Sequence, residues 1–153
     1  MIDTDGVKTE LQKFCDPEYS GYLGNVPDFD TAKQRAIDGW ASALEVGFTA
    51  ITPISTSLLA AKSAFQAAAV GMHISGAVFQ AAINAFFATL ATGMLVPGPA
   101  VSSTPPPGVY LPVSAGPSHE TMCSDFAIQL TAFAQNGTAT LNIPPIFPTV
   151  NWS

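Results

Sequence analysis

Apolar residues recur every three or four positions over three stretches of the chain, a spacing that places them on one face of an α-helix. The pattern predicts helices over 4–15, about 31–49 and about 119–135. Their apolar faces consist, in order, of Val7, Leu11 and Phe14; Ile37, Trp40, Leu44 and Phe48; and Met122, Phe126, Leu130 and Phe133. Asp28 or Asp30, and Ser118, stand where a side chain accepts hydrogen bonds from the free amides of a first helical turn.

Residues 57–95 predict a long alanine-rich helix or a pair of helices. Large apolar residues step along this region at intervals of three to seven, and alanine fills most of the gaps, so neighbouring helices can approach closely. The large residues are Leu58, Phe65, Met72, Phe79, Phe86, Leu90 and Met94. A kink or a break is expected between Gly71 and Gly76, because glycine destabilises a helix interior. One unbroken helix would extend for roughly 58 Å at about 1.5 Å per residue, which is long for a small domain.

Proline excludes helix and interior strand from two further segments, because it lacks a backbone donor. Residues 97–117 are therefore predicted to form a linker or an arm that lies on the surface. The tail begins with polar and apolar residues in alternation over 138–143, which predicts a short strand, and its later prolines predict an extended strap. Residues 16–27 are rich in Pro, Gly and Tyr and predict an irregular arm.

The predicted fold is a small, mostly α helical bundle with proline-rich extended arms and a short C-terminal strand. A chain of 153 residues is long enough for one hydrophobic core. Residues 1–30 are assigned to a short helix and an arm, 31–137 to a helical domain that includes the linker 97–117, and 138–153 to an extended C-terminal tail.

Charge is scarce and unevenly distributed. Charged residues make up 10% of the chain, against about 25% in an average soluble domain. Every Lys and Arg lies at or before Lys62, no charged residue occurs from Ser63 to His119, and only Glu120 and Asp125 follow. No basic face can be built to neutralise phosphates, so direct nucleic-acid binding is not expected. The 48% hydrophobic content argues against disorder.

The uncharged middle of the chain allows two explanations. Residues 76–96 are long enough to cross a bilayer, as in a small phage-encoded membrane protein of the holin type. Gln80 and Asn84 near the middle, the many alanines and the lack of flanking Lys or Arg argue against this alternative. A solitary helical bundle should leave one face of each helix in water, so neighbouring subunits are the simpler explanation for a long stretch without charge.

Residues suited to catalysis or metal binding are few. Consecutive Ser118, His119 and Glu120 cannot converge as a catalytic triad, and their position favours the start of a helix. Cys15 and Cys123, with His73 and His119, lack the spacing of a zinc site. Without an export signal both thiols are expected to be free and buried, with a disulfide as the alternative. Helix capping or a place on a solvated arm, rather than metal binding, explains the aspartate pairs Asp28 with Asp30 and Asp3 with Asp5. No enzyme activity, cofactor or metal is predicted.

Several short motifs lie in about the last hundred residues. The alanine-rich region ends in Ala91-Thr-Gly-Met94, and the proline-rich segment contains Thr104-Pro-Pro-Pro107. The tail carries Asn136-Gly-Thr-Ala-Thr140 and Val150-Asn-Trp152. Together they resemble small virion proteins of contractile-tailed bacteriophages. The resemblance implies a structural subunit present in symmetric copies in the tail, baseplate or neck, with extended arms that lace neighbouring subunits together.

These patterns predict a non-enzymatic subunit of a multi-subunit assembly. The expected partners are further copies of the chain, other virion structural proteins, or both. The expected location is the virion, assembled in the host cytoplasm, and membrane insertion is the disfavoured alternative. Aromatic residues dominate the energetics of interfaces. The predicted interface residues are Phe79, Phe86, Phe87, Ile146, Phe147 and Trp152.

Overall fold

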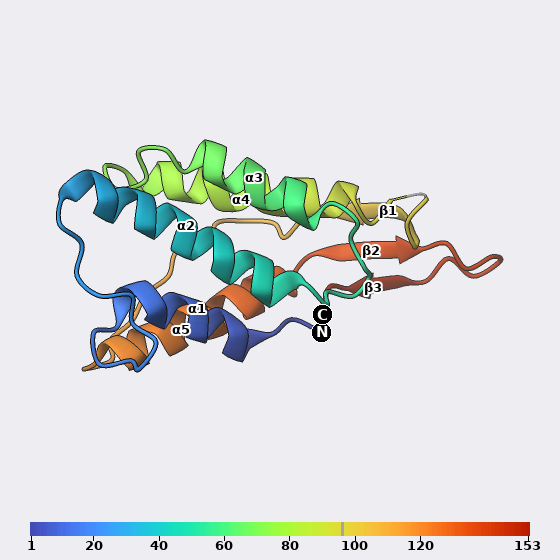
Figure 1. Cartoon of the computed structure of the whole chain (residues 1–153). Coiled ribbons are helices and arrows are strands. Elements are labelled where there is room, and N and C mark those ends of the chain that lie inside the picture. The colour runs from blue at the N-terminus through green and yellow to red at the C-terminus, as the bar shows by residue number, and fades with distance from the viewer. Residues whose placement is uncertain (96) are drawn as a thin grey trace.

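The computed structural model describes residues 1–95 and 97–153, and within them the fold is mostly α, as predicted (Figure 1). The helices are α1 (Thr4–Cys15), α2 (Phe29–Phe48), α3 (Leu58–Ala68), α4 (Gly76–Thr92) and α5 (His119–Ala134). The strands are β1 (Ala100–Thr104), β2 (Thr138–Leu141) and β3 (Thr149–Asn151). The helices predicted over 4–15, 31–49 and 119–135 are therefore confirmed to within two residues at each end.

Short polar side chains begin most of the helices. Asp28 accepts a hydrogen bond from the Thr31 amide at 2.8 Å, and Ser118 accepts one from the Thr121 amide at 3.1 Å. Ser118 was the predicted cap of its helix and Asp28 was one of two candidates for the other, and both satisfy amides that have no partner inside the helix. Asp3 caps α1 in the same way. These bonds explain why the chain turns into helix where it does.

The alanine-rich region 57–95 forms a helix pair rather than one long helix. The break lies between α3 and α4, where Gly71 has a φ of +91°, a conformation that glycine adopts without steric penalty. The Ser75 side chain then accepts a hydrogen bond from the Ala77 amide and begins α4. Figure 1 shows α3 and α4 lying side by side. Alanines such as Ala61 and Ala82, both fully buried, let the two helices approach closely.

The helices pack in a simple order, with α5 against α1, α1 against α2, α2 against α3 and α3 against α4. In Figure 1 the pair α1 and α5 lies on one side, the pair α3 and α4 on the other, and α2 runs between them. Edge-to-face aromatic contacts fill the centre. The ring of Phe48 on α2 lies 5.6 Å from that of Phe86 and 5.2 Å from that of Phe87, both on α4. The ring of Phe87 also lies 5.6 Å from that of Phe133 on α5, so aromatic packing joins the two sides of the bundle.

A small antiparallel sheet, in the order β1-β2-β3, closes one end of the bundle. Thr104 on β1 lies opposite Thr138 on β2, and Thr140 on β2 lies opposite Thr149 on β3. The predicted strand at 138–143 is confirmed as β2. Two strands were missed, because β1 lies in the segment predicted to be a linker or arm and β3 in the segment predicted to be a strap. Both are edge strands, where flanking prolines are tolerated.

Candidate interaction surface

The outer faces of α3 and α4 form an exposed surface without charge. Each helix buries one face, through residues such as Phe65 on α3 and Ile83 on α4, both fully buried. The opposite faces carry small or uncharged side chains exposed to solvent: Leu59, Ala60, Ser63 and Ala67 on α3, and Ala77, Ala81, Asn84, Ala88 and Thr92 on α4. We call this surface the α3/α4 face. One side of each helix therefore does face solvent, and that side lacks the charged coat of an ordinary soluble surface.

A proline-rich arm, 105–117, extends the uncharged surface. Tyr110 anchors the arm, since its ring is buried and its hydroxyl donates a hydrogen bond to the Phe126 carbonyl at 2.9 Å. Burial raises the pKa of the Tyr110 hydroxyl. Val109, Leu111 and Val113 are 52%, 61% and 67% exposed. The arm is held on the body of its own chain and presents apolar side chains outward.

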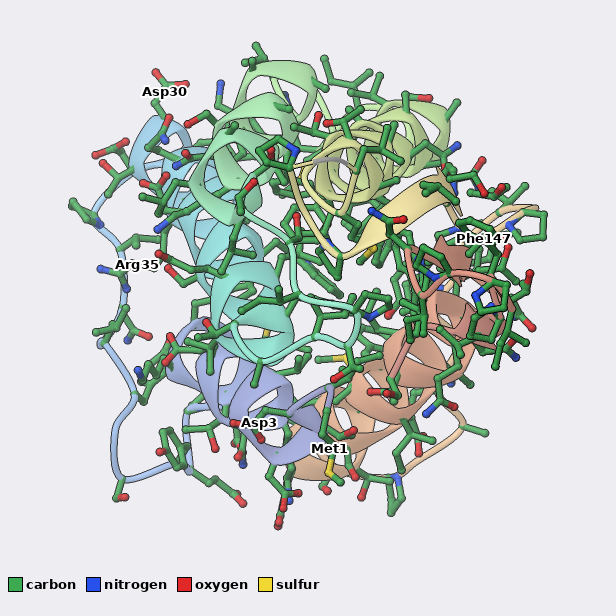
Figure 2. All side chains as sticks on the ribbon, turned by 90° about the vertical axis from the view of Figure 1, so that its right-hand side faces the viewer. Met1, Asp3, Asp30, Arg35 and Phe147 are labelled. Atoms are coloured by element: carbon green, nitrogen blue, oxygen red, sulfur yellow. The ribbon has the colours of Figure 1, made fainter. Side chains whose placement is uncertain are left out.

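The loop between β2 and β3, residues 142–148, forms an apolar tip that projects beyond the helices (Figure 1). Ile146 is 77% exposed and Phe147 is 44% exposed. The amides of both residues bond the Ile143 carbonyl at 3.0 Å, which makes the loop a defined turn. Phe147 has a φ of +43°, in the left-handed region that a bulky residue rarely adopts. Figure 2 shows Phe147 at the edge of the molecule.

The structure places the predicted interface residues in two different environments. Phe86, Phe87 and Trp152 are at most 1% exposed in the core of the chain itself, and Phe79 is half-buried against Trp40. Only Ile146 and Phe147 offer exposed surface. The phenylalanine stripe of α4 faces the chain's own helices, so Phe86 and Phe87 hold the fold together and do not present surface to another chain.

Trp152 enters the core because β3 returns alongside β2. Its ring centroid lies 6.1 Å from that of Phe87, and its amide donates to the Gly137 carbonyl at 2.9 Å. A Cβ atom added to Gly137 would lie 2.5 Å from the indole ring, so only glycine allows this approach. Within the described residues, the indole Nε1 is a buried donor without a hydrogen-bond partner. The sequence signal for this contact was Gly137 itself, which follows the helix predicted over 119–135.

The charged residues gather on the other elements. Lys8 on α1 pairs with Glu120 on α5 at 2.8 Å, and this hydrogen bond raises the pKa of Lys8. Lys33 pairs with Asp30 at the start of α2, and Lys62 on α3 pairs with Glu45 on α2. Lys62 lies beside α2, away from the outward positions of α3. The molecule therefore has a charged side on α1, α2 and α5 and an uncharged side on α3, α4 and the arm.

The two cysteines come together between α1 and α5. Both are free, Cys123 is fully buried and Cys15 is partly buried. The hydrogen bond with Cys123, and then burial, raises the pKa of the Cys15 thiol. The same bond lowers the pKa of Cys123, although burial opposes this shift. The prediction of free thiols agrees with this arrangement.

The remaining candidates for chemistry stay apart. The imidazole of His73 lies 5.6 Å from the ring of Phe29, edge to face, and is exposed. His119 is exposed, next to the Ser118 hydroxyl that caps α5. Among residues 1–95 and 97–153, no group of three or more His, Cys, Asp or Glu side chains is placed to hold a metal ion.

The possible membrane span 76–96 includes α4 and the turn after it. No helix in the described part of the chain is both long and apolar enough to cross a bilayer, and Val96, the last residue of the proposed span, lies outside that part. The holin alternative is therefore not favoured. Comparison with family models, with curated proteins and with solved structures finds no match for this chain.

Proposed function

We propose that this chain is a non-enzymatic structural subunit whose uncharged side is covered by other chains in an assembly. The observation that carries the proposal is the separation of charge. The α3/α4 face, the arm and the tip contain no Asp, Glu, Lys or Arg, whereas every charged residue except Lys62 lies on α1, α2 or α5 or in the segments that flank α1 and α2. A monomer depends on charged side chains over its whole surface for solubility, and the central part of an interface is depleted of them.

The character of the exposed side chains supports association rather than solvation. Leu59 is 69% exposed and Ile74 is 81% exposed, both within the alanine-rich region. Leu111 on the arm is 61% exposed. Single exposed apolar residues are ordinary, but several of them on elements whose outer faces carry no charge are typical of a contact with another protein. Small side chains on α4 would let a partner helix approach closely.

The resemblance of the last hundred residues to small virion proteins of contractile-tailed bacteriophages suggests the setting. In this proposal the chain is assembled in the host cytoplasm into the tail, baseplate or neck of a virion, against copies of itself, other structural proteins, or both. The arm and the tip agree with such a role, because both present apolar side chains away from the body.

Two double variants with equal charge change test the proposal. Ala81→Glu with Ala88→Glu places two carboxylates on the α3/α4 face, at exposed positions where the fold should tolerate them. Gln34→Glu with Ala132→Glu adds the same charge at exposed positions of α2 and α5. Light scattering on a sizing column should show an assembly that the first variant disrupts and the second retains. Equal behaviour of the two variants would remove the α3/α4 face from the proposal.

The virion setting has a separate test. Quantitative mass spectrometry of purified particles from a contractile-tailed phage that encodes the chain should detect it at a fixed copy number per particle. A chain confined to the infected-cell lysate, and absent from purified particles, would contradict the virion role.

A further inference from the structure

The outer edge of β3 has free hydrogen-bonding groups. Leu141 donates to the Pro148 carbonyl and Trp152 donates to the Gly137 carbonyl, which places Pro148, Val150 and Trp152 in the hydrogen-bonded positions facing β2. In an antiparallel pair the intervening residues direct their backbone groups to the other side. The amides and carbonyls of Thr149 and Asn151 therefore point outward, and no backbone partner for them occurs within the described residues.

The free edge has defined ends. At one end, Ser153 exchanges two backbone hydrogen bonds with Thr52, of 2.7 and 2.9 Å, so that position is already occupied. At the other end, the chain turns at Phe147 into the apolar tip. The accessible edge is thus the length of β3 alone, and only a short strand from another molecule can pair with it.

An apolar groove lies beside this edge. It has a volume of about 460 Å³ and is lined by residues that include Pro53, Ile54, Pro99, Leu141 and Val150. Leu141 and Val150 belong to the inner face of the sheet, the face on which Trp152 meets the helices. Pro53 and Pro99 flank this face in the groove, and Ile54 remains 63% exposed.

We propose that a second copy of this chain docks here, with the two β3 strands paired antiparallel about a two-fold axis and Val150 of one copy opposite Val150 of the other. This inference rests on the proposed role as an assembly subunit and identifies one of its contacts. Thr149 of each copy then pairs with Asn151 of the other, with about four backbone hydrogen bonds, and the two sheets become one continuous sheet.

The tip and the groove fit the same symmetry. The groove wall formed by Pro53 and Ile54 adjoins the pair of Thr52 and Ser153, at the end of β3 opposite the tip. Antiparallel pairing therefore brings the tip of each copy to this wall of the groove of the other. The left-handed turn at Phe147 directs the chain away from the edge at the point where Thr52 of the second copy stands. Ile146 and Phe147 then lie against Pro53 and Ile54 of the second copy. The contact is self-complementary, as a two-fold interface must be.

Charge favours a second copy over a lipid surface as the occupant. Neither the tip, the edge nor the groove contains Asp, Glu, Lys or Arg, so two identical surfaces meet without repulsion between charged side chains. No Lys or Arg follows Lys62 that would attract anionic headgroups to the tip. The outward amides of Thr149 and Asn151 would also lose their hydrogen bonds in hydrocarbon.

A pair of substitutions at one position tests the strand pairing. Asn151→Pro removes the outward amide without touching the bonds to β2, and Asn151→Ala keeps that amide. Sedimentation equilibrium of the full chain should show a dimer that dissociates at least about tenfold more readily in the proline variant and is unchanged in the alanine variant. Circular dichroism verifies that both variants retain the fold. Equal dimerisation of the two variants would overturn the pairing.

A charge exchange tests the contact of tip and groove without altering the backbone. Ile54→Asp and Ile146→Lys each change an exposed residue, and each should weaken the dimer. Combined in one chain, they should restore it, because aspartate in the groove of one copy meets lysine on the tip of the other. Failure of the double variant to associate better than either single variant would contradict the arrangement.

These results separate the inference from the proposed function. A chain that assembles equally well with Asn151→Pro and with Ile54→Asp overturns this dimer and leaves the assembly role in place. A chain that stays monomeric at millimolar concentration overturns the dimer, and its absence from purified particles would overturn the proposed function as well.

Discussion

Truncation of Trp152 distinguishes a residue that holds the fold from one that serves an interface. Its side chain is 1% exposed. A buried tryptophan removes about 200 Å² from water, which corresponds to about 5 kcal/mol at about 25 cal/mol per Å². The unpaired indole Nε1 offsets part of this, since an unsatisfied buried donor costs about 1–3 kcal/mol. Trp152→Ala should therefore lower the free energy of unfolding by about 3 kcal/mol.

Urea denaturation followed by far-ultraviolet circular dichroism measures the effect. With an m-value of about 2 kcal/mol per molar, the midpoint should fall by about 1.5 M. Phe147→Ala is the matched control, because Phe147 was predicted to have the same role but lies exposed on the tip. In dilute, monomeric protein this change should stay within about 0.5 kcal/mol. An unchanged midpoint for Trp152→Ala, or equal losses for the two variants, would refute the assignment of Trp152 to the core.

Three other perturbations have defined outcomes. Gly137→Ala should destabilise the chain by about 1–3 kcal/mol, because the new Cβ would lie 2.5 Å from the Trp152 ring. The loss should disappear when Gly137→Ala is combined with Trp152→Ala, and additive losses would contradict the contact. A thiol oxidant such as diamide, which accepts the two thiol hydrogens, should form a disulfide between Cys15 and Cys123 and raise the unfolding free energy of dilute protein by about 4 kcal/mol. The Cys15→Ser variant should be unaffected. A product that is only intermolecular would count against the proximity of the two cysteines. Asp28→Ala should lower the thermal midpoint at neutral pH, because hydrogen bonds from Thr31 hold the pKa of Asp28 below its usual value. This stabilisation is present above the pKa of Asp28 in the unfolded chain and is lost as pH falls through its pKa in the folded chain, so the midpoints of the variant and the unaltered chain should converge in acid. A constant difference between the two midpoints would argue against the cap.

The helices were predictable from the sequence because their signals are local. Asp28 and Ser118 mark helix starts, and the apolar spacing between such marks indicates each buried face. The choice between one helix and two in 57–95 was left open. It depended on Gly71, whose positive φ ends the continuous helix. Local patterns of this kind are visible in a single sequence.

The sheet and the fate of the aromatic residues were not predictable in the same way. Strand β1 pairs with β2 across the whole of α5, and such a pairing leaves no local periodicity in the five residues Ala100–Thr104. Trp152 and Phe147 are both aromatic residues in a proline-rich tail, yet one fills the core and the other is exposed. What separates them is their position relative to β3, since Trp152 directly follows the strand on its buried face and Phe147 lies in the turn before it, and this appears only once the partner strand is known.

The scarcity of charge is explained in part by the fold. The chain buries its own phenylalanine stripe without help from another subunit, so the stripe does not require a partner. The exposed faces of α3 and α4 remain uncharged even so. The case for association therefore rests on the outside of these helices and not on their aromatic residues.

Light scattering on the full chain, from micromolar to millimolar concentration, tests the central claim most directly. If other chains cover the uncharged side, the measured mass should rise with concentration to a multiple of 15.9 kDa, and Ala81→Glu with Ala88→Glu should lower the mass at each concentration. A mass of 15.9 kDa throughout, for a protein that remains freely soluble, would contradict the account.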